Sequence, residues 1–74
     1  MDELLEHLSS DVRLRRKSLG LTQADLAAMA QVGTRFVHEL EHGKVTVRLD
    51  KLASVLDVLG LELRATLRRP GVGS

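Results

Sequence analysis

Residues 22–42, T-Q-A-D-L-A-A-M-A-Q-V-G-T-R-F-V-H-E-L-E-H, constrain the fold most, because they predict two short helices joined by a tight turn. Thr22 is a good N-cap for the first helix, and Gly43 is expected to end the second helix as its C′ residue. The turn between the helices falls at residues 31–33. The inward positions of both helices predict one small core, formed by Leu26, Ala30, Val32, Val37 and Leu40. The second helix therefore carries its polar side chains on a buried support.

This stretch resembles the helix-turn-helix of the Xre/phage-repressor family. That family has Gln first in the first helix, Ala fifth, and apolar residues fourth, eighth, tenth, fifteenth and eighteenth. The matching residues are Gln23, Ala27, Leu26, Ala30, Val32, Val37 and Leu40. Residues 40–44, L-E-H-G-K, also look like the family, and the resemblance covers residues 8–60. One departure is Gln31, where the family usually has Gly, so Gln31 must accept a strained left-handed conformation.

The resemblance implies a set of DNA-contacting residues on and around the second helix. The residues expected to read bases, or to lie next to them, are Thr34, Arg35, His38 and Glu39. Phosphate contacts are expected from Gln23 at a helix N-terminus, and from Lys44 and Arg48 beyond the second helix. We interpret Phe36 as an apolar contact to a thymine methyl group rather than as a core residue. Gly33 serves either the turn or a close approach to the DNA backbone.

The resemblance also implies one structural ion pair. In the family, an Arg of the preceding helix pairs with the Glu that ends the recognition helix. By position these residues are Arg16 and Glu41. We therefore expect the pair to hold the recognition helix in place rather than to contact DNA.

The distribution of charge favours a nucleic-acid partner more than the net charge of +1 does. Four acidic residues and no Lys or Arg precede Arg13, whereas from Val12 onward eleven basic and six acidic residues give +5. Phe36 is the only Phe, Tyr or Trp, which argues against stacking on single-stranded bases. The chain has no cysteine, and this excludes disulfides and thiolate metal sites.

The flanking segments predict the rest of an all-α, lambda-repressor-like domain with four to five short helices. Residues 1–19 predict one or two helices, with Ser9 or Ser10 as a candidate N-cap. Residues 48–59 predict the last helix, which Gly60 ends. Further positions expected to face the core are Leu8, Val12, Leu19 and Met29.

Residues 61–67, L-E-L-R-A-T-L, alternate strictly and predict a half-buried β-strand. A lone strand leaves its backbone groups unpaired, so we expect it to pair with the same strand of a second copy about a two-fold axis. The side chains expected at this dimer contact are Leu61, Leu63, Ala65 and Leu67. The alternative is an extended segment that lies on its own helices. The domain then spans residues 1–67, and residues 68–74 are expected to form a flexible tail.

A helix-turn-helix followed by a strand resembles the HipB-type antitoxin branch of the family. Residues 46–52, T-V-R-L-D-K-L, and residues 55–63, V-L-D-V-L-G-L-E-L, also look like this branch. The resemblance implies a homodimeric repressor that binds a palindromic operator in its own operon and also binds a HipA-type kinase toxin. We expect a cytoplasmic, nucleoid-associated protein that is not an enzyme, with no cofactor, no metal and no membrane-spanning stretch.

Two alternatives to a DNA-binding protein stay open. Residues 38–42, H-E-L-E-H, match the zinc-protease pattern H-E-x-x-H, in which two His side chains hold zinc and the Glu acts as a base. A catalytic zinc needs a third protein ligand, and the remaining histidine, His7, lies in a weakly constrained segment, so a metallopeptidase is the lesser alternative. The other alternative is a module that uses the fold for protein interactions without binding DNA.

Overall fold

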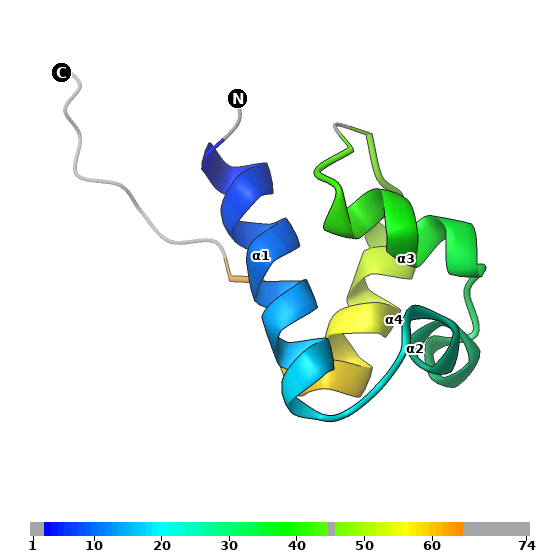
Figure 1. Ribbon diagram of the computed structural model, residues 1–74. Coiled ribbons are helices and arrows are strands. Elements are labelled where there is room, and N and C mark those ends of the chain that lie inside the picture. Colours follow the sequence, from blue (N-terminus) through cyan, green and yellow to red (C-terminus); the bar gives the residue numbers. More distant parts are fainter. Residues whose placement is uncertain (1–2, 45, 65–74) are drawn as a thin grey trace, which may run out of the picture.

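The computed structural model describes residues 3–44 and 46–64, and these form four α-helices and no β-strand (Figure 1). The helices are α1 (Glu3–Ser18), α2 (Gln23–Ala30), α3 (Thr34–Glu41) and α4 (Leu49–Leu59). Both α1 and α2 pack against α3 and α4. The predicted helix-turn-helix is the α2–α3 pair, and α1 and α4 pack against it. None of the helices in the described ranges is long and apolar enough to cross a lipid bilayer.

The N-terminal residues form a single continuous helix, α1, rather than two. Ser9 lies in the middle of α1, where its buried hydroxyl donates a hydrogen bond to the carbonyl oxygen of Leu5 over 2.7 Å. The prediction of an N-cap at Ser9 or Ser10 was therefore wrong. A serine inside a helix satisfies its hydroxyl on the carbonyl one turn earlier, and this bond replaces the capping interaction.

The core contains side chains from all four helices. The buried apolar residues are Val12, Leu26, Ala27, Ala30, Val37, Leu40, Leu52, Val55, Leu56 and Leu59. Val32 is partly buried at its edge, so the small core predicted between α2 and α3 is confirmed. Leu19 and Met29 are 44% and 57% exposed, and their predicted core positions were wrong.

Each of the four helices ends in the same pair of backbone hydrogen bonds. At α3, the N–H of Gly43 donates to the carbonyl oxygen of Leu40 and the N–H of Lys44 donates to that of Glu39, over 3.2 and 3.1 Å. This pair defines the Schellman motif, in which the C′ residue has a positive φ. The four C′ residues are Gly20, Gln31, Gly43 and Gly60. Gln31 has φ 59° and ψ 43°, so its predicted left-handed conformation is confirmed.

Residues 61–64 follow α4 and do not pair as a strand with any other described residue. Leu61 packs against the core, whereas Leu63 is 52% exposed. The predicted contacts Ala65 and Leu67, and the predicted tail, lie outside the described residues. Pairing about a two-fold axis needs a second copy, so the strand over residues 61–67 stays a prediction.

Candidate nucleic-acid interface

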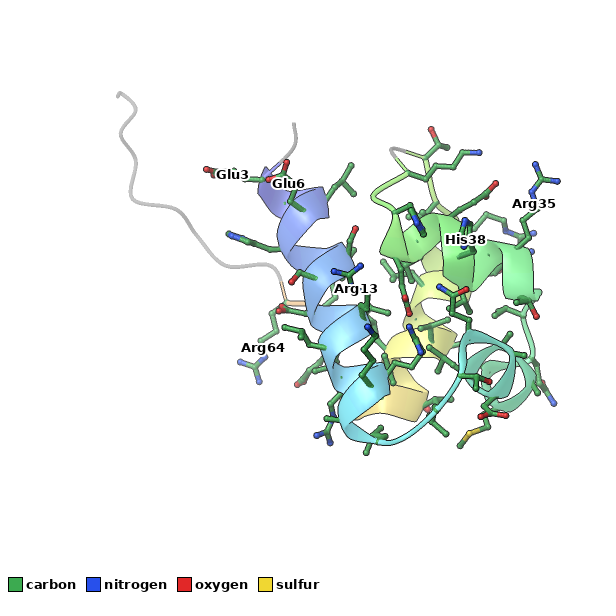
Figure 2. The ribbon with its side chains drawn as sticks, in the orientation of Figure 1. Glu3, Glu6, Arg13, Arg35, His38 and Arg64 are labelled. Carbon is green, nitrogen blue, oxygen red and sulfur yellow. The ribbon has the colours of Figure 1, made fainter. Side chains whose placement is uncertain are left out.

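The outer face of α3 carries the side chains that were predicted to read DNA. Val37 and Leu40 are buried and fix one side of α3 against the core. Thr34, Arg35 and His38 are exposed on the other side. Figure 2 shows Arg35 projecting outward from α3, away from α1. This arrangement presents donors and acceptors from a short helix whose own position is fixed.

Three of the predicted residues form a charged network on this face. The Nε of Arg35 donates a hydrogen bond to Glu39 Oε2 over 3.1 Å, and the Nζ of Lys44 lies 3.5 Å from the same oxygen. The hydrogen bond from Arg35 and the charges of Arg35 and Lys44 hold the pKa of Glu39 below its ordinary value. Glu39 is therefore ionised at neutral pH and lies between two cations.

Gly33 precedes α3 in the chain and Arg48 follows it. Both were expected near DNA, and they differ in the contacts that they make within the protein. Gly33 is the N-cap of α3, with φ −76°, and a Cβ added there meets no atom within 4 Å. The turn thus does not require glycine, which leaves a close approach to DNA as the predicted reason for it. Arg48, at the N-cap of α4, is exposed and bonded to Asp50 through Nε and Nη2 over 3.1 and 2.7 Å.

Gln23, which was expected to contact a DNA phosphate, forms a hydrogen bond with another side chain of the protein. Its side-chain Nε2 donates a hydrogen bond to Glu41 Oε1 over 3.1 Å, and the residue is half-buried. Its amide oxygen cannot donate to a phosphate, so any phosphate contact at α2 falls to the second Nε2 hydrogen or to the backbone N–H groups of the helix N-terminus. That N-terminus also holds a carboxylate, because Thr22 and Asp25 form a reciprocal capping box with both bonds at 2.9 Å.

The structure brings Arg16 and Glu41 together in a buried, two-pronged ion pair. Arg16 Nε and Nη2 donate to the two carboxylate oxygens of Glu41 over 2.6 and 2.9 Å, and the Glu41 side chain is 1% exposed. Arg16 Nη1 also donates to the carbonyl oxygen of Leu21 over 2.8 Å. With Gln23 on Glu41 as well, this network ties α1, the α1–α2 turn, α2 and the end of α3 to one another.

The pKa of Glu41 reflects opposing influences. Burial raises the pKa. Hydrogen bonds from Arg16 and Gln23 and the positive charges of Arg16 and Arg13 together lower it by more than burial raises it, so the net shift is downward. Arg13 was not singled out from the sequence. It is exposed on α1 and, with His42, lines an open pocket of about 240 Å³ between α1 and the end of α3. No local pattern in the sequence indicates this proximity, because it depends on how α1 packs on α3.

Phe36, which was expected to contact a thymine methyl group, lies at the edge of the core. Its ring is half-buried and packs against the core, and Lys51 Nζ lies 5.8 Å from the ring centroid. Because the ring is only half-buried, it can still contact a thymine methyl group, and that contact stays a prediction. The packing shows that Phe36 also fastens α3 to α4.

His38 and His42, the two histidines of H-E-L-E-H, stack on one side of α3. Their ring centroids are 4.1 Å apart, and His42 Nδ1 lies 2.7 Å from the carbonyl oxygen of His38. In the part of the chain that the structure describes, no group of three or more His, Cys, Asp or Glu side chains is close enough to hold a metal ion.

A second exposed surface is apolar and lies away from α3. Leu4, Leu49 and Leu63 are 69%, 67% and 52% exposed. A groove of about 380 Å³ runs between α4 and residues 61–63, and a second groove runs between α1 and the same residues. Figure 2 places Arg64, which follows these residues, on the side of α1 opposite α3. None of the residues that line these two grooves belongs to α3.

Two comparisons with known proteins each match most of the chain. A family model described as helix-turn-helix matches residues 12–65. The chain is also 44% identical, over 52 residues, to the uncharacterized HTH-type transcriptional regulator y4mF of Sinorhizobium fredii (strain NBRC 101917 / NGR234). The aligned region covers 70% of this chain and 68% of that protein. The matched residues include α2, α3 and α4 in full.

Proposed function

Because the chain belongs to the helix-turn-helix family, we propose that it is a transcriptional regulator that binds operator DNA as a homodimer. The observation that carries the proposal is the outer face of α3. There Arg35 and His38 are exposed on a helix that is fixed by a buried ion pair and by its apolar side. A rigid helix with exposed donors fits the major groove, where base edges are distinguishable.

The name of the similar Sinorhizobium protein, a transcriptional regulator, supports the regulatory part of the proposal. The charge distribution supports the DNA-binding part, since the basic excess lies from Val12 onward and includes α3 and the residues after it. Repression of an operator is the mode of regulation that the Xre-type resemblance favours.

The exposed apolar surface supports the homodimer. Leu49 and Leu63 line one groove together, and no residue of α3 lines it. A patch of this kind on a small domain is a typical site of association. A two-fold pair places two copies of α3 in successive major grooves, about one helical turn apart, and so reads a palindrome.

The finer part of the proposal is that the chain acts as the HipB-like antitoxin of a toxin-antitoxin operon and binds a HipA-type kinase toxin. The motif over residues 46–63 and the expected strand over residues 61–67 support this branch. Co-expression of the chain with a kinase encoded next to its gene, followed by gel filtration, tests it. Elution of the two proteins as one complex supports the antitoxin role, and separate elution argues against it.

The DNA-binding proposal is tested by two substitutions that should fail differently. Arg35 has a two-pronged donor suited to guanine O6 and N7, whereas Lys44 offers a mobile point charge suited to phosphate. Arg35→Ala is expected to cost about 1–3 kcal/mol of binding and to relax preference at one position in each half-site. Lys44→Ala is expected to weaken all duplexes alike and to reduce the salt slope by about one unit.

Titrations against a randomised operator library at two or more salt concentrations measure both effects. An even loss of affinity for Arg35→Ala, together with a changed base preference for Lys44→Ala, would mean that the two roles are reversed. If the unmodified protein shows no salt-dependent duplex binding, the protein-interaction module is the better interpretation of the fold.

A further inference from the structure

Arg35 and Glu39 are joined through one particular nitrogen. The guanidinium group has one N–H on Nε and four on the two terminal nitrogens. Only the Nε bonds to Glu39, over 3.1 Å. Among the described residues, the terminal nitrogens have no hydrogen-bond partner, and the Arg35 side chain is 88% exposed. The bond therefore leaves free the two nitrogens that fork onto guanine O6 and N7.

Glu39 is less exposed than the side chain that it holds. Its side chain is 30% exposed, against 88% for Arg35 and 51% for Lys44. The Schellman motif at the end of α3 brings Lys44 back over Glu39, since the N–H of Lys44 donates to the carbonyl oxygen of Glu39. One carboxylate oxygen thus interacts with both the predicted base-reading residue and a predicted phosphate-binding residue.

The position of this carboxylate has a cost for DNA binding. A negative charge on the outer face of α3 repels the phosphate backbone, and it neutralises part of the charge of Arg35 and Lys44. The cost is the same for every DNA sequence. A gain arises only where a guanine meets the terminal nitrogens of Arg35, because the bond to Glu39 has already fixed their direction. Because the cost applies to every duplex and the gain only to duplexes that carry the guanine, the carboxylate increases the difference in affinity between them.

On the premise of the proposed DNA-reading role, we propose that Glu39 is a positioning and specificity-determining residue that aims Arg35 at a guanine and disfavours duplexes that lack it. In this role Glu39 acts through Arg35. The rival role is direct recognition, in which Glu39 accepts a hydrogen bond from cytosine N4. The two roles differ in whether the effect of Glu39 survives the loss of Arg35.

The test begins with the half-site that the unmodified protein selects from randomised duplexes. Dissociation constants are measured for that duplex, for the same duplex with the Arg35-dependent guanine changed to adenine, and for a random duplex. The variants are Glu39→Gln, Arg35→Ala and the double substitution. The control is Glu3→Gln, which removes the same charge from the first turn of α1, where Figure 2 shows Glu3 on the side away from α3.

The unmodified protein is expected to prefer guanine over adenine by about tenfold or more. Glu39→Gln is expected to reduce that preference on the order of fivefold, to tighten random-duplex binding, and to steepen the salt slope by about one unit. The double variant is expected to have the same base preference as Arg35→Ala alone, because Glu39 has nothing left to position. Glu3→Gln is expected to leave the preference unchanged. A folding defect would weaken all duplexes and would not reproduce this pattern.

Two results overturn the positioning role while leaving the proposed function intact. One is an unchanged guanine preference in Glu39→Gln when Arg35→Ala loses it. The other is a loss of preference at a different base position that adds to the loss from Arg35→Ala, which would show that Glu39 reads a base itself. Absence of duplex binding by the unmodified protein would overturn both the proposed function and the role of Glu39.

Discussion

Gln31 has the least favourable backbone conformation among the described residues, as their only non-glycine with a positive φ. It occupies the C′ position of α2, where the other three helices have glycine. The left-handed region brings a side chain's Cβ close to the following carbonyl oxygen, and glycine avoids this clash. The turn of the helix-turn-helix is thus closed by a residue that the backbone geometry does not favour.

Gln31→Gly is therefore expected to stabilise the fold. Relief of the left-handed strain is worth about 1–2 kcal/mol, and the larger entropy of glycine in the unfolded chain offsets up to about 1 kcal/mol of it. Urea unfolding followed by circular dichroism measures the net gain. Gln31→Ala serves as the control, since it shortens the side chain and keeps the strain, and it is expected to leave the midpoint near that of the unmodified protein. A lower midpoint for Gln31→Gly would mean that the Gln31 side chain stabilises the turn.

Glu41 sets a dependence of stability on pH. Its pKa in the folded protein is lowered, so its contribution is fully present above the unfolded value near 4.5 and is lost as pH falls through the folded value. Glu41→Ala is expected to cost about 1–3 kcal/mol at pH 7, because Arg16 is left buried without a counter-charge. Melting curves between pH 7 and pH 3 should show a steeper acid-induced decrease for the unmodified protein than for Glu41→Ala. Equal melting temperatures at pH 7 would contradict a stabilising pair.

At the scale of helices, the local sequence was sufficient for α3 and α4, because apolar residues at helical spacing and a glycine after each helix are local signals. At the end of α2 the left-handed conformation of Gln31 was expected from the family resemblance. At the start of α1 the local signal misled, because a serine suits both an N-cap and a mid-helix bond to the carbonyl one turn earlier. Periodicity also locates the inward face of a helix only to within one position. For this reason Leu19 and Met29 were expected to be buried, although they are exposed.

The candidate site was predictable to different degrees. Arg35 and Glu39 are one helical turn apart, so their contact follows from spacing alone. The approach of Lys44 to Glu39 depends on the turn that follows α3, and the use of Gln23 by Glu41 depends on packing between helices. The pair of Arg16 with Glu41 was implied by family resemblance, because no local pattern links residues that lie 25 positions apart.

The glycines on either side of α3 are expected to respond differently to substitution. Gly43 has φ +75°, so Gly43→Ala should destabilise the fold by about 1–2 kcal/mol and displace Lys44. Gly33 has an ordinary φ and an open Cβ position, and serine is a favoured N-cap, so Gly33→Ser should keep or raise the melting temperature. If the DNA backbone approaches Gly33 closely, Gly33→Ser should nevertheless weaken duplex binding. Unchanged binding would leave no role for glycine at this position.

At the scale of the whole molecule, the helical domain was predicted but its mode of association was not settled. The alternation over residues 61–67 favours a strand, yet within the described residues Leu61 packs on the core and Leu63 is exposed beside α4. A short amphipathic segment suits either a shared sheet or an extended cover on its own helices. Sequence alone does not decide between them, because the choice depends on the free energy of association.

Leu63→Pro tests the predicted homodimer. Among the described residues the N–H of Leu63 makes no backbone hydrogen bond, so proline there should not disturb the helical domain. Proline removes a donor that a strand ladder needs, and the variant should sediment as a monomer. Leu63→Val, which favours a strand, is the matched control and should remain a dimer. A monomeric unmodified protein at tens of micromolar would contradict the strand prediction.

The network of Arg16, Glu41 and Gln23 also limits how the sequence can diverge over time. A change at position 16 or 41 alone leaves a buried charge unmatched, whereas replacing both with well-packed apolar residues is often neutral or stabilising. Single mutational steps therefore cross a fitness valley, and the two positions are expected to be inherited and exchanged together. Position 23 contributes one hydrogen bond to the edge of the pair and can drift more freely. Selection acting on the outer face of α3 is thus separated from selection acting on the buried residues that support it.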